Sequence, residues 1–191
     1  MRIESLQVER FGRFHNFRPE PFGGGLTVLY GRNEAGKSTL LAFVRSVLFG
    51  FPTSRSKENR YEPWCGGTVQ GTLDLRTRDG VLYRVSRTSG PKGGPVQVFR
   101  EGRRLEGGQA LESLLGPISP EVFRKVFAFS LWELQDLGAL NQGEVREALY
   151  GAGSGGIRVA SVEKVLCDEA QRLFKSGGNA KAPLNQALRE I

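Results

Sequence analysis

The chain has 191 residues, of which 39% are hydrophobic, and this composition suits one domain with room for an extension. The N-terminus carries charges where a secretory signal needs an apolar run, and no segment is long and apolar enough to predict a membrane span. The cysteines, Cys65 and Cys167, lack the spacing of a metal or redox site, so we expect a soluble, cytoplasmic protein with reduced thiols.

The net charge of +7 permits attraction to a polyanion such as DNA or RNA. The arginines and lysines are scattered along the chain, however, and no tight basic run occurs. A scattered pattern is also typical of an ordinary solvated surface. Charge alone therefore leaves nucleic-acid binding open.

The first part of the chain predicts three strands and a helix. Residues 2–9 and 13–18 have the pattern of two short strands joined at Phe11-Gly12, and residues 26–30 form an apolar run rich in β-forming residues. From residue 38 to residue 49 the apolar side chains recur at helical spacing. Between this third strand and the helix lies a glycine-containing loop.

That loop reads GRNEAGKST, residues 31–39, and it fits the phosphate-binding pattern G-x-x-x-x-G-K-[ST]. Strand, glycine loop and helix occur in the order that the pattern requires. Backbone N–H groups and the positive end of the helix would face phosphate oxygens, Lys37 would reach the β- and γ-phosphates, and Ser38 would bind magnesium. The alternative is a plain glycine turn. We expect a site for a nucleoside triphosphate, with ATP and Mg²⁺ as the cofactors.

The next segments predict a loop and an antiparallel patch. Residues 53–67 have no apolar period and indicate a surface loop with exposed Tyr61 and Trp64. From Thr68 the period becomes two, and a hairpin is predicted around Asp79-Gly80. Two further strand-like runs follow and end near Glu106. This antiparallel patch is inserted after the first helix.

The last third of the chain is mainly helical in pattern. Ser119 and Pro120 are typical of a helix start, and residues 126–130 fit either a strand or the end of that helix. Two more helices are predicted at 143–150 and 159–175, separated by the glycine cluster GAGSGG. The final run, APLNQALREI, begins a helix without an end signal, so we expect either a piece of a longer protein or a frayed terminus.

Two short matches in this region resemble parts of an ABC-type ATPase site. Ser154-Gly155-Gly156 resembles the signature, and residues 165–169, VLCDE, resemble a Walker B strand. The spacing from Ser154 to Asp168 is too short for a helix of about 11 residues, a turn and a strand of about 5. Apolar residues there also recur at three and four, as on one helix face. We therefore interpret the glycines as a loop and Asp168 and Glu169 as a solvated helix face.

The opening I-x-x-L-x-V-x-x-F-G-x-F, followed by G-L-T-V-L-Y-G-R-N-E-A-G-K-S-T-L-L, resembles the N-terminal half of SbcC/SMC-type ABC ATPase heads. FVRSVLFGFP behind the loop makes it most similar to the YhaN-like branch, and the similarity continues to the last residues. The resemblance implies an α/β P-loop NTPase lobe with a mixed sheet, an antiparallel β patch and emerging coiled-coil helices. Residues 1–156 would form the lobe that carries Walker A, and residues 157–191 would lead into a coiled coil.

The same resemblance implies a split ATPase. The protein's own C-terminal lobe, absent here, would supply the true signature and Walker B residues. ATP would clamp two heads into a homodimer, and the whole protein would act with a nuclease subunit on DNA, in repair or end processing. This chain alone would bind ATP but turn it over inefficiently, because no carboxylate stands in a suitable context to position water.

The resemblance also carries over site residues. The nucleotide contacts would be Gly31, Asn33, Glu34, Ala35, Gly36, Lys37, Ser38 and Thr39. Arg13 lies where such heads approach the nucleotide and is a further candidate. The family usually places a glutamine after the antiparallel patch, whereas FSLWELQDL offers Glu133, or Gln135 slightly later, or neither.

Two other classes of function stay open at this point. A self-contained P-loop kinase would need a lid and an acceptor site with clustered arginines. A GTPase would need a base-reading N-K-x-D-like motif, and the sequence contains none. A nucleotide-gated scaffold without enzymatic activity would need only the phosphate loop.

Overall fold

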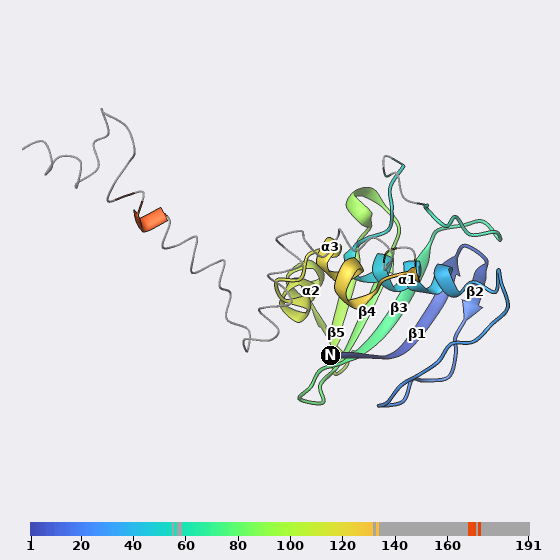
Figure 1. Ribbon diagram of the computed structural model, residues 1–191, viewed down its shortest axis with the longest axis horizontal. Helices are drawn as coiled ribbons and strands as arrows, with labels where there is room; N and C mark the ends of the chain where they lie inside the picture. Colours follow the sequence, from blue (N-terminus) through green and yellow to red (C-terminus); the bar gives the residue numbers. More distant parts are fainter. Residues whose placement is uncertain (55, 57–58, 132, 134–167, 171, 173–191) are drawn as a thin grey trace, which may run out of the picture. The chain divides into compact units, whose positions relative to one another are not determined.

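The computed structural model describes residues 1–54, 56, 59–131, 133, 168–170 and 172 (Figure 1). The chain divides into two compact units, Met1–Leu131 and Trp132–Ile191. The first unit contains the sheet, the helices that cover it and the phosphate loop. The predicted domain boundary between residues 156 and 157 lies outside the described residues.

Six strands form one sheet in the order β2-β1-β3-β4-β5-β6. Every pairing among them is antiparallel, so the parallel part of the expected mixed sheet is not seen in the described residues. The predicted hairpin is confirmed, with Gly80 in the left-handed region at φ +82°. The strands are β1 (Arg2–Phe11), β2 (Phe14–Phe17), β3 (Gln70–Arg76), β4 (Leu82–Thr88), β5 (Val96–Arg100) and β6 (Arg103–Leu105).

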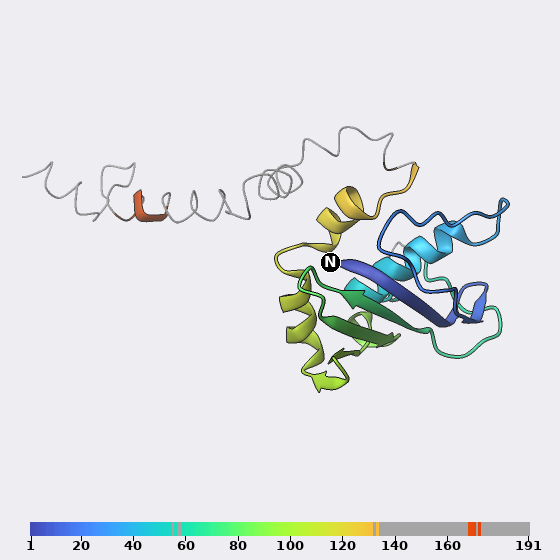
Figure 2. The ribbon, with the colours of Figure 1, turned by 90° about the horizontal axis from the view of Figure 1, so that it is seen from below.

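Helix α1 (Lys37–Phe49) covers one face of this sheet (Figure 2). Alternation along the strands places apolar side chains on that face and polar ones on the other. The fully buried ring of Phe43 packs edge-on against Phe11 of β1, with ring centroids 5.5 Å apart. The largest side chains of the resulting core are Phe11, Phe43, Leu73, Leu75, Val8, Val47, Val85 and Val98.

The C-terminal end of α1 is held by a buried arginine. Arg87 of β4 is 8% exposed, and its guanidinium donates to the carbonyl oxygens of Val47 at 2.8 Å and Leu48 at 3.2 Å. It also donates to the Gly94 carbonyl at 2.9 Å. Burial lowers the pKa of Arg87, but an arginine stays charged near neutral pH. The cation therefore satisfies carbonyls of the last turn, which have no partner inside the helix.

Three short helical elements follow the sheet: α2 (Gly107–Leu115), α3 (Pro120–Val122) and the π-helical η2 (Phe123–Phe127). The predicted start at Ser119 is confirmed, because its hydroxyl accepts a hydrogen bond from the Val122 N–H at 3.2 Å. Residues 126 and 127 belong to η2, which confirms the helix end and not the strand for this segment. Helix α2 was not predicted from the sequence.

The prediction of a strand at residues 26–30 is wrong. The segment has no strand conformation, and none of the described strands pairs with it. Its apolar side chains lie in solvent, with Leu26 95%, Val28 75% and Tyr30 95% exposed. A strand requires a neighbour for its backbone hydrogen bonds, and β-forming side chains alone do not supply one.

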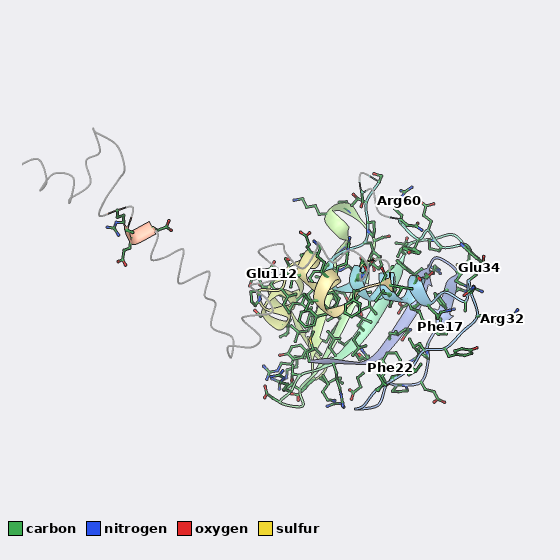
Figure 3. All side chains as sticks on the ribbon, viewed as in Figure 1. Phe17, Phe22, Arg32, Glu34, Arg60 and Glu112 are labelled. Carbon is green, nitrogen blue, oxygen red and sulfur yellow. The ribbon has the colours of Figure 1, made fainter. Side chains whose placement is uncertain are left out.

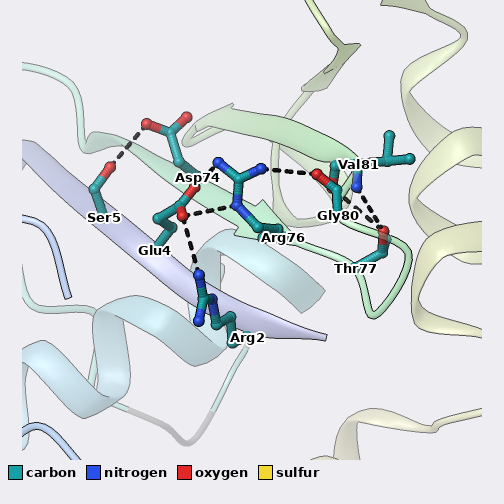
Figure 4. Close-up of polar contacts among 8 residues, drawn as sticks. All are labelled: Arg2, Glu4, Ser5, Asp74, Arg76, Thr77, Gly80 and Val81. Carbon is teal, nitrogen blue, oxygen red and sulfur yellow. Dashed lines mark hydrogen bonds and ion pairs between the residues drawn. The ribbon is translucent and has the colours of Figure 1, made fainter. Parts of the chain in front are cut away.

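Ion pairs on the polar side of the sheet join neighbouring strands (Figure 4). The carboxylate of Glu4 accepts two hydrogen bonds from Arg76, both at 2.7 Å, and the Arg76 hydrogen bond holds the pKa of Glu4 below its ordinary value. Asp74 accepts from Ser5 at 2.7 Å and from Arg84 at 2.7 Å. These side-chain contacts join the neighbouring strands β1, β3 and β4 and support their pairing.

Several sequence predictions fall in the second unit. The helix predicted at 143–150, the GAGSGG loop and the final helix lie outside the described residues. In the predicted helix 159–175 the described residues, Asp168, Glu169, Ala170 and Arg172, are helical and exposed. This confirms the solvated position expected for Asp168 and Glu169, whereas Ala170 was expected on the apolar face of the helix. Among the helices that the structure describes, none has the length and apolar character to cross a membrane.

Candidate nucleotide-binding site

The phosphate loop wraps the N-terminal end of α1. Gly36 precedes the helix in the left-handed region at φ +99°, a conformation that favours glycine. The first intrahelical bond runs from the Leu40 N–H to the Gly36 carbonyl at 2.9 Å, so the N–H groups of residues 37–39 have no partner within the helix. The first turn contains no acidic residue. This end of α1 therefore presents free donors and a positive dipole, as anion sites do.

The Lys37 side chain turns back into the loop. Its ammonium nitrogen, Nζ, donates to the Gly31 carbonyl at 2.6 Å and to the Arg32 carbonyl at 2.8 Å. The side chain is exposed, so the ammonium lies at the surface of the loop. A positive charge beside the unpaired N–H groups of a helix N-terminus is the arrangement that binds phosphate.

The turn between β1 and β2 lies against this loop. Arg13 donates from Nη1 to the Glu34 carbonyl. A Cβ atom on Gly36 would lie only 2.5 Å from the Phe14 ring, so this glycine is also required for the close approach of the two segments. Arg13 is thus beside the loop, as the resemblance implied, and a role in contacting nucleotide stays a prediction.

The remaining predicted loop residues complete the same turn. Glu34 has a left-handed backbone at φ +66°, and the Ala35 N–H donates to the Arg32 carbonyl at 3.1 Å. Asn33 is exposed at the tip, and Figure 3 shows Arg32 and Glu34 at the outer edge of the molecule. Thr39 closes the loop on the helix side.

Ser38 carries the hydroxyl group that is suited to bind a magnesium ion. It is exposed in the first turn of α1, directly after Lys37. Across the described ranges, no group of three or more His, Cys, Asp or Glu side chains forms a cation site. Magnesium bound with a nucleotide takes few protein ligands and fills its octahedron with phosphate oxygens and water. A single hydroxyl at this place fits that chemistry.

The two candidates for the family's glutamine both follow the first unit in the chain. Glu133 is helical and half-buried and belongs to the second unit, whereas Gln135 lies outside the described residues. Both stay predictions.

A family model described as an AAA domain matches residues 1–191, which is the whole chain. The chain belongs to the AAA domain family. The YhaN protein of Bacillus subtilis (strain 168) is 30% identical over 192 aligned residues, which cover all of this chain and 19% of YhaN. This AAA domain therefore spans about a fifth of the length of the curated relative that it matches.

A solved structure of the recombination mediator protein RecF in the RecFOR pathway is also similar to the AAA domain. It has 21% sequence identity and a TM-score of 0.44, and the match covers 64% of this chain and 33% of RecF.

The surroundings of the loop in the AAA domain are not evident from the sequence. The sequence contains no signal that Phe14 lies against Gly36, and its pattern predicts only a surface loop for the segment that carries Tyr61 and Trp64. That segment binds the β1–β2 turn, because the Trp64 N–H donates to the Gly12 carbonyl at 2.9 Å. An exposed tryptophan in an otherwise polar loop was the available signal.

Proposed function

We propose that this AAA domain binds Mg²⁺–ATP as the N-terminal lobe of an ATPase head whose site is completed by other parts of a longer protein. The observation that carries the proposal is the Lys37 ammonium lying at the surface of the loop, beside the N–H groups of residues 37–39, which have no partner within α1. The loop N–H groups and Lys37 would hold the phosphates, and Ser38 would be the protein ligand of the magnesium ion.

The proposed site is half of a catalytic site. Hydrolysis needs a carboxylate or amide that positions water and an acidic group near the metal. In the described part of the chain, no cluster of such groups accompanies the loop. The exposed apolar segment Leu26–Tyr30 leads directly into Gly31, and we infer that it becomes a strand when a C-terminal lobe supplies its neighbour. That lobe would also bring the missing acidic residues.

The wider role follows from the SbcC/YhaN-like sequence pattern. We propose that two heads dimerise on ATP and that the whole protein acts with a nuclease subunit in DNA repair or end processing. A net charge of +7 permits attraction to a polyanionic partner and is compatible with this role.

Isothermal titration calorimetry with ATP and Mg²⁺ tests the binding. Lys37→Ala should weaken ATP binding by at least about a hundredfold, because charged hydrogen bonds to two phosphates contribute about 1.5–3 kcal/mol each. Arg78→Ala, which removes an exposed positive charge in the β3–β4 turn, is the matched control and should leave the affinity unchanged. Equal ATP affinity in wild type and Lys37→Ala would contradict the proposed site.

The rate of ATP hydrolysis tests whether the catalytic site is divided between this chain and other parts of a longer protein. The 191-residue chain should hydrolyse ATP slowly, whereas the longer protein should hydrolyse it efficiently and respond to DNA. Full turnover by this chain alone would show that the site is complete and that the lobe proposal is wrong.

A further inference from the structure

Trp64 is an exposed aromatic residue in a turn that is closed by a backbone hydrogen bond. Its side chain is 79% exposed, yet it lies in the turn Pro63–Gly66, which is closed by a 2.9 Å hydrogen bond from the Gly66 N–H to the Pro63 carbonyl. Nearby, the Tyr61 ring stacks on the buried Phe11 ring with centroids 5.0 Å apart. The backbone that carries the tryptophan is therefore held by hydrogen bonds, although the ring itself contributes little to the core.

Two backbone hydrogen bonds tie this turn to the β1–β2 turn. The Gly12 N–H donates to the Tyr61 carbonyl at 2.7 Å, and the Gly12 carbonyl accepts from the Trp64 N–H at 2.9 Å. Gly12 in turn lies against the phosphate loop, since a Cβ atom on it would be 3.1 Å from the Thr39 methyl carbon. Only one residue thus separates the Trp64 backbone from the end of the loop.

The ring itself is connected to the other side of the loop through Arg13. The guanidinium carbon of Arg13 lies 5.7 Å from the centroid of the Trp64 ring, in a cation–π contact. The same guanidinium donates to the Glu34 carbonyl in the loop. One flexible side chain therefore bridges the tryptophan face and the phosphate site.

We propose that Trp64 is the surface on which the base of the bound nucleotide stacks. The inference rests on the proposed function, because the loop must hold the phosphates for the base to reach the Trp64 ring. Stacking of a base on an aromatic ring is stronger than an exposed cation–π contact, so the base takes the ring face that Arg13 covers. The Arg13 guanidinium is then released toward the phosphates, where it gains charged hydrogen bonds.

This contact recognises a π-face and reads no base edge. Stacking is tolerant of base identity because every base presents such a face. Trp64 should therefore add affinity for ATP and GTP alike, and it should add none for tripolyphosphate, which carries the same charges without a base.

The test measures the dissociation constants of ATP, GTP and tripolyphosphate with Mg²⁺ in wild type, Trp64→Ala and Trp64→Phe. Trp64→Ala should weaken the binding of both nucleotides about tenfold and leave the binding of tripolyphosphate unchanged. Trp64→Phe should recover most of the lost affinity for the nucleotides. Melting temperatures should be equal in all three proteins because the ring is exposed. A loss of ATP affinity that tripolyphosphate shares, or no loss at all, would overturn the proposal.

A fluorescence readout keeps this inference separate from the proposed function. The chain has two tryptophans, so Trp132→Phe leaves Trp64 as the single emitter. ATP should change its emission, whereas tripolyphosphate should bind without changing it. If ATP binds in a Lys37-dependent manner but the emission is constant, the stacking proposal alone is wrong. If Lys37→Ala binds ATP with the affinity of wild type, the assignment of the phosphate site is wrong.

Discussion

The core of the AAA domain contains one glycine whose replacement should be strongly destabilising. Gly71 of β3 faces Phe43 of α1, and a Cβ atom on it would lie 2.0 Å from Cε2 and 2.1 Å from Cζ of that ring. Carbon atoms in contact are about 3.5 Å apart, so Gly71→Ala requires the ring to move by about 1.5 Å. Phe43 is fully buried and packs against Phe11, which leaves little space for such a movement.

Overpacking a well-packed core costs about 1–3 kcal/mol, and the enclosed ring places Gly71→Ala near 3 kcal/mol. Urea denaturation followed by circular dichroism measures the free energy of unfolding. Gly108→Ala in α2 is the matched control, because its Cβ atom would meet nothing within 4 Å. It should stabilise by about 0.5 kcal/mol, since alanine favours the helix over glycine.

A double mutant tests the cause of the Gly71 effect. Phe43→Leu shortens the obstructing side chain, so Gly71→Ala should cost at least about 1 kcal/mol less in that background than in wild type. Additive effects of the two substitutions, or a loss below about 0.5 kcal/mol for Gly71→Ala alone, would refute the steric reasoning.

Two further predictions concern buried polar groups. Arg87→Met keeps the apolar volume but leaves the Val47 and Leu48 carbonyls without their donor, so it should cost about 3 kcal/mol in urea denaturation, and Arg87→Lys should cost less. Burial raises the pKa of Glu9, and one of its carboxylate oxygens is buried without a partner. Because a raised folded-state pKa means that stability is lost as pH rises through it, the stability of Glu9→Gln relative to wild type should increase as pH rises above 4.5, the ordinary pKa of a glutamate.

Each of these predictions has its own opposing outcome. Equal stability of Arg87→Met and wild type would mean that the carbonyls at the end of α1 find other partners. For Glu9, a difference between variant and wild type that is constant with pH would show that the carboxylate does not titrate differently on folding.

The parts of the fold that the sequence predicted correctly depend on local chemistry. Asp79-Gly80 specifies a tight turn between two alternating runs, and Ser119 with Pro120 specifies a helix start. The phosphate loop is local too, since its residues are consecutive, and Lys37 was found from the motif alone.

Helix α2 was missed because its local signals oppose a helix. It begins with Gly107-Gly108, which disfavour helix formation, and its N-cap residue, Glu106, makes no side-chain cap hydrogen bond. What holds it is tertiary, since Leu111 and Leu115 are buried in the core. The position of Trp64 beside the loop has the same kind of origin, because it depends on hydrogen bonds between residues far apart in the chain.

The segment Leu26–Tyr30 shows the opposite case, in which a strong local pattern does not produce the element. Burying a large apolar side chain contributes about 1.5–3 kcal/mol, so exposing Leu26, Val28 and Tyr30 together forgoes several kcal/mol. A neighbouring strand from another lobe would recover this free energy and satisfy the segment's backbone hydrogen bonds. Because Gly31 follows Tyr30 directly, fixing the segment as a strand would also fix the start of the phosphate loop. Lobe docking and nucleotide binding would then stabilise one another, since each orders the same stretch of backbone.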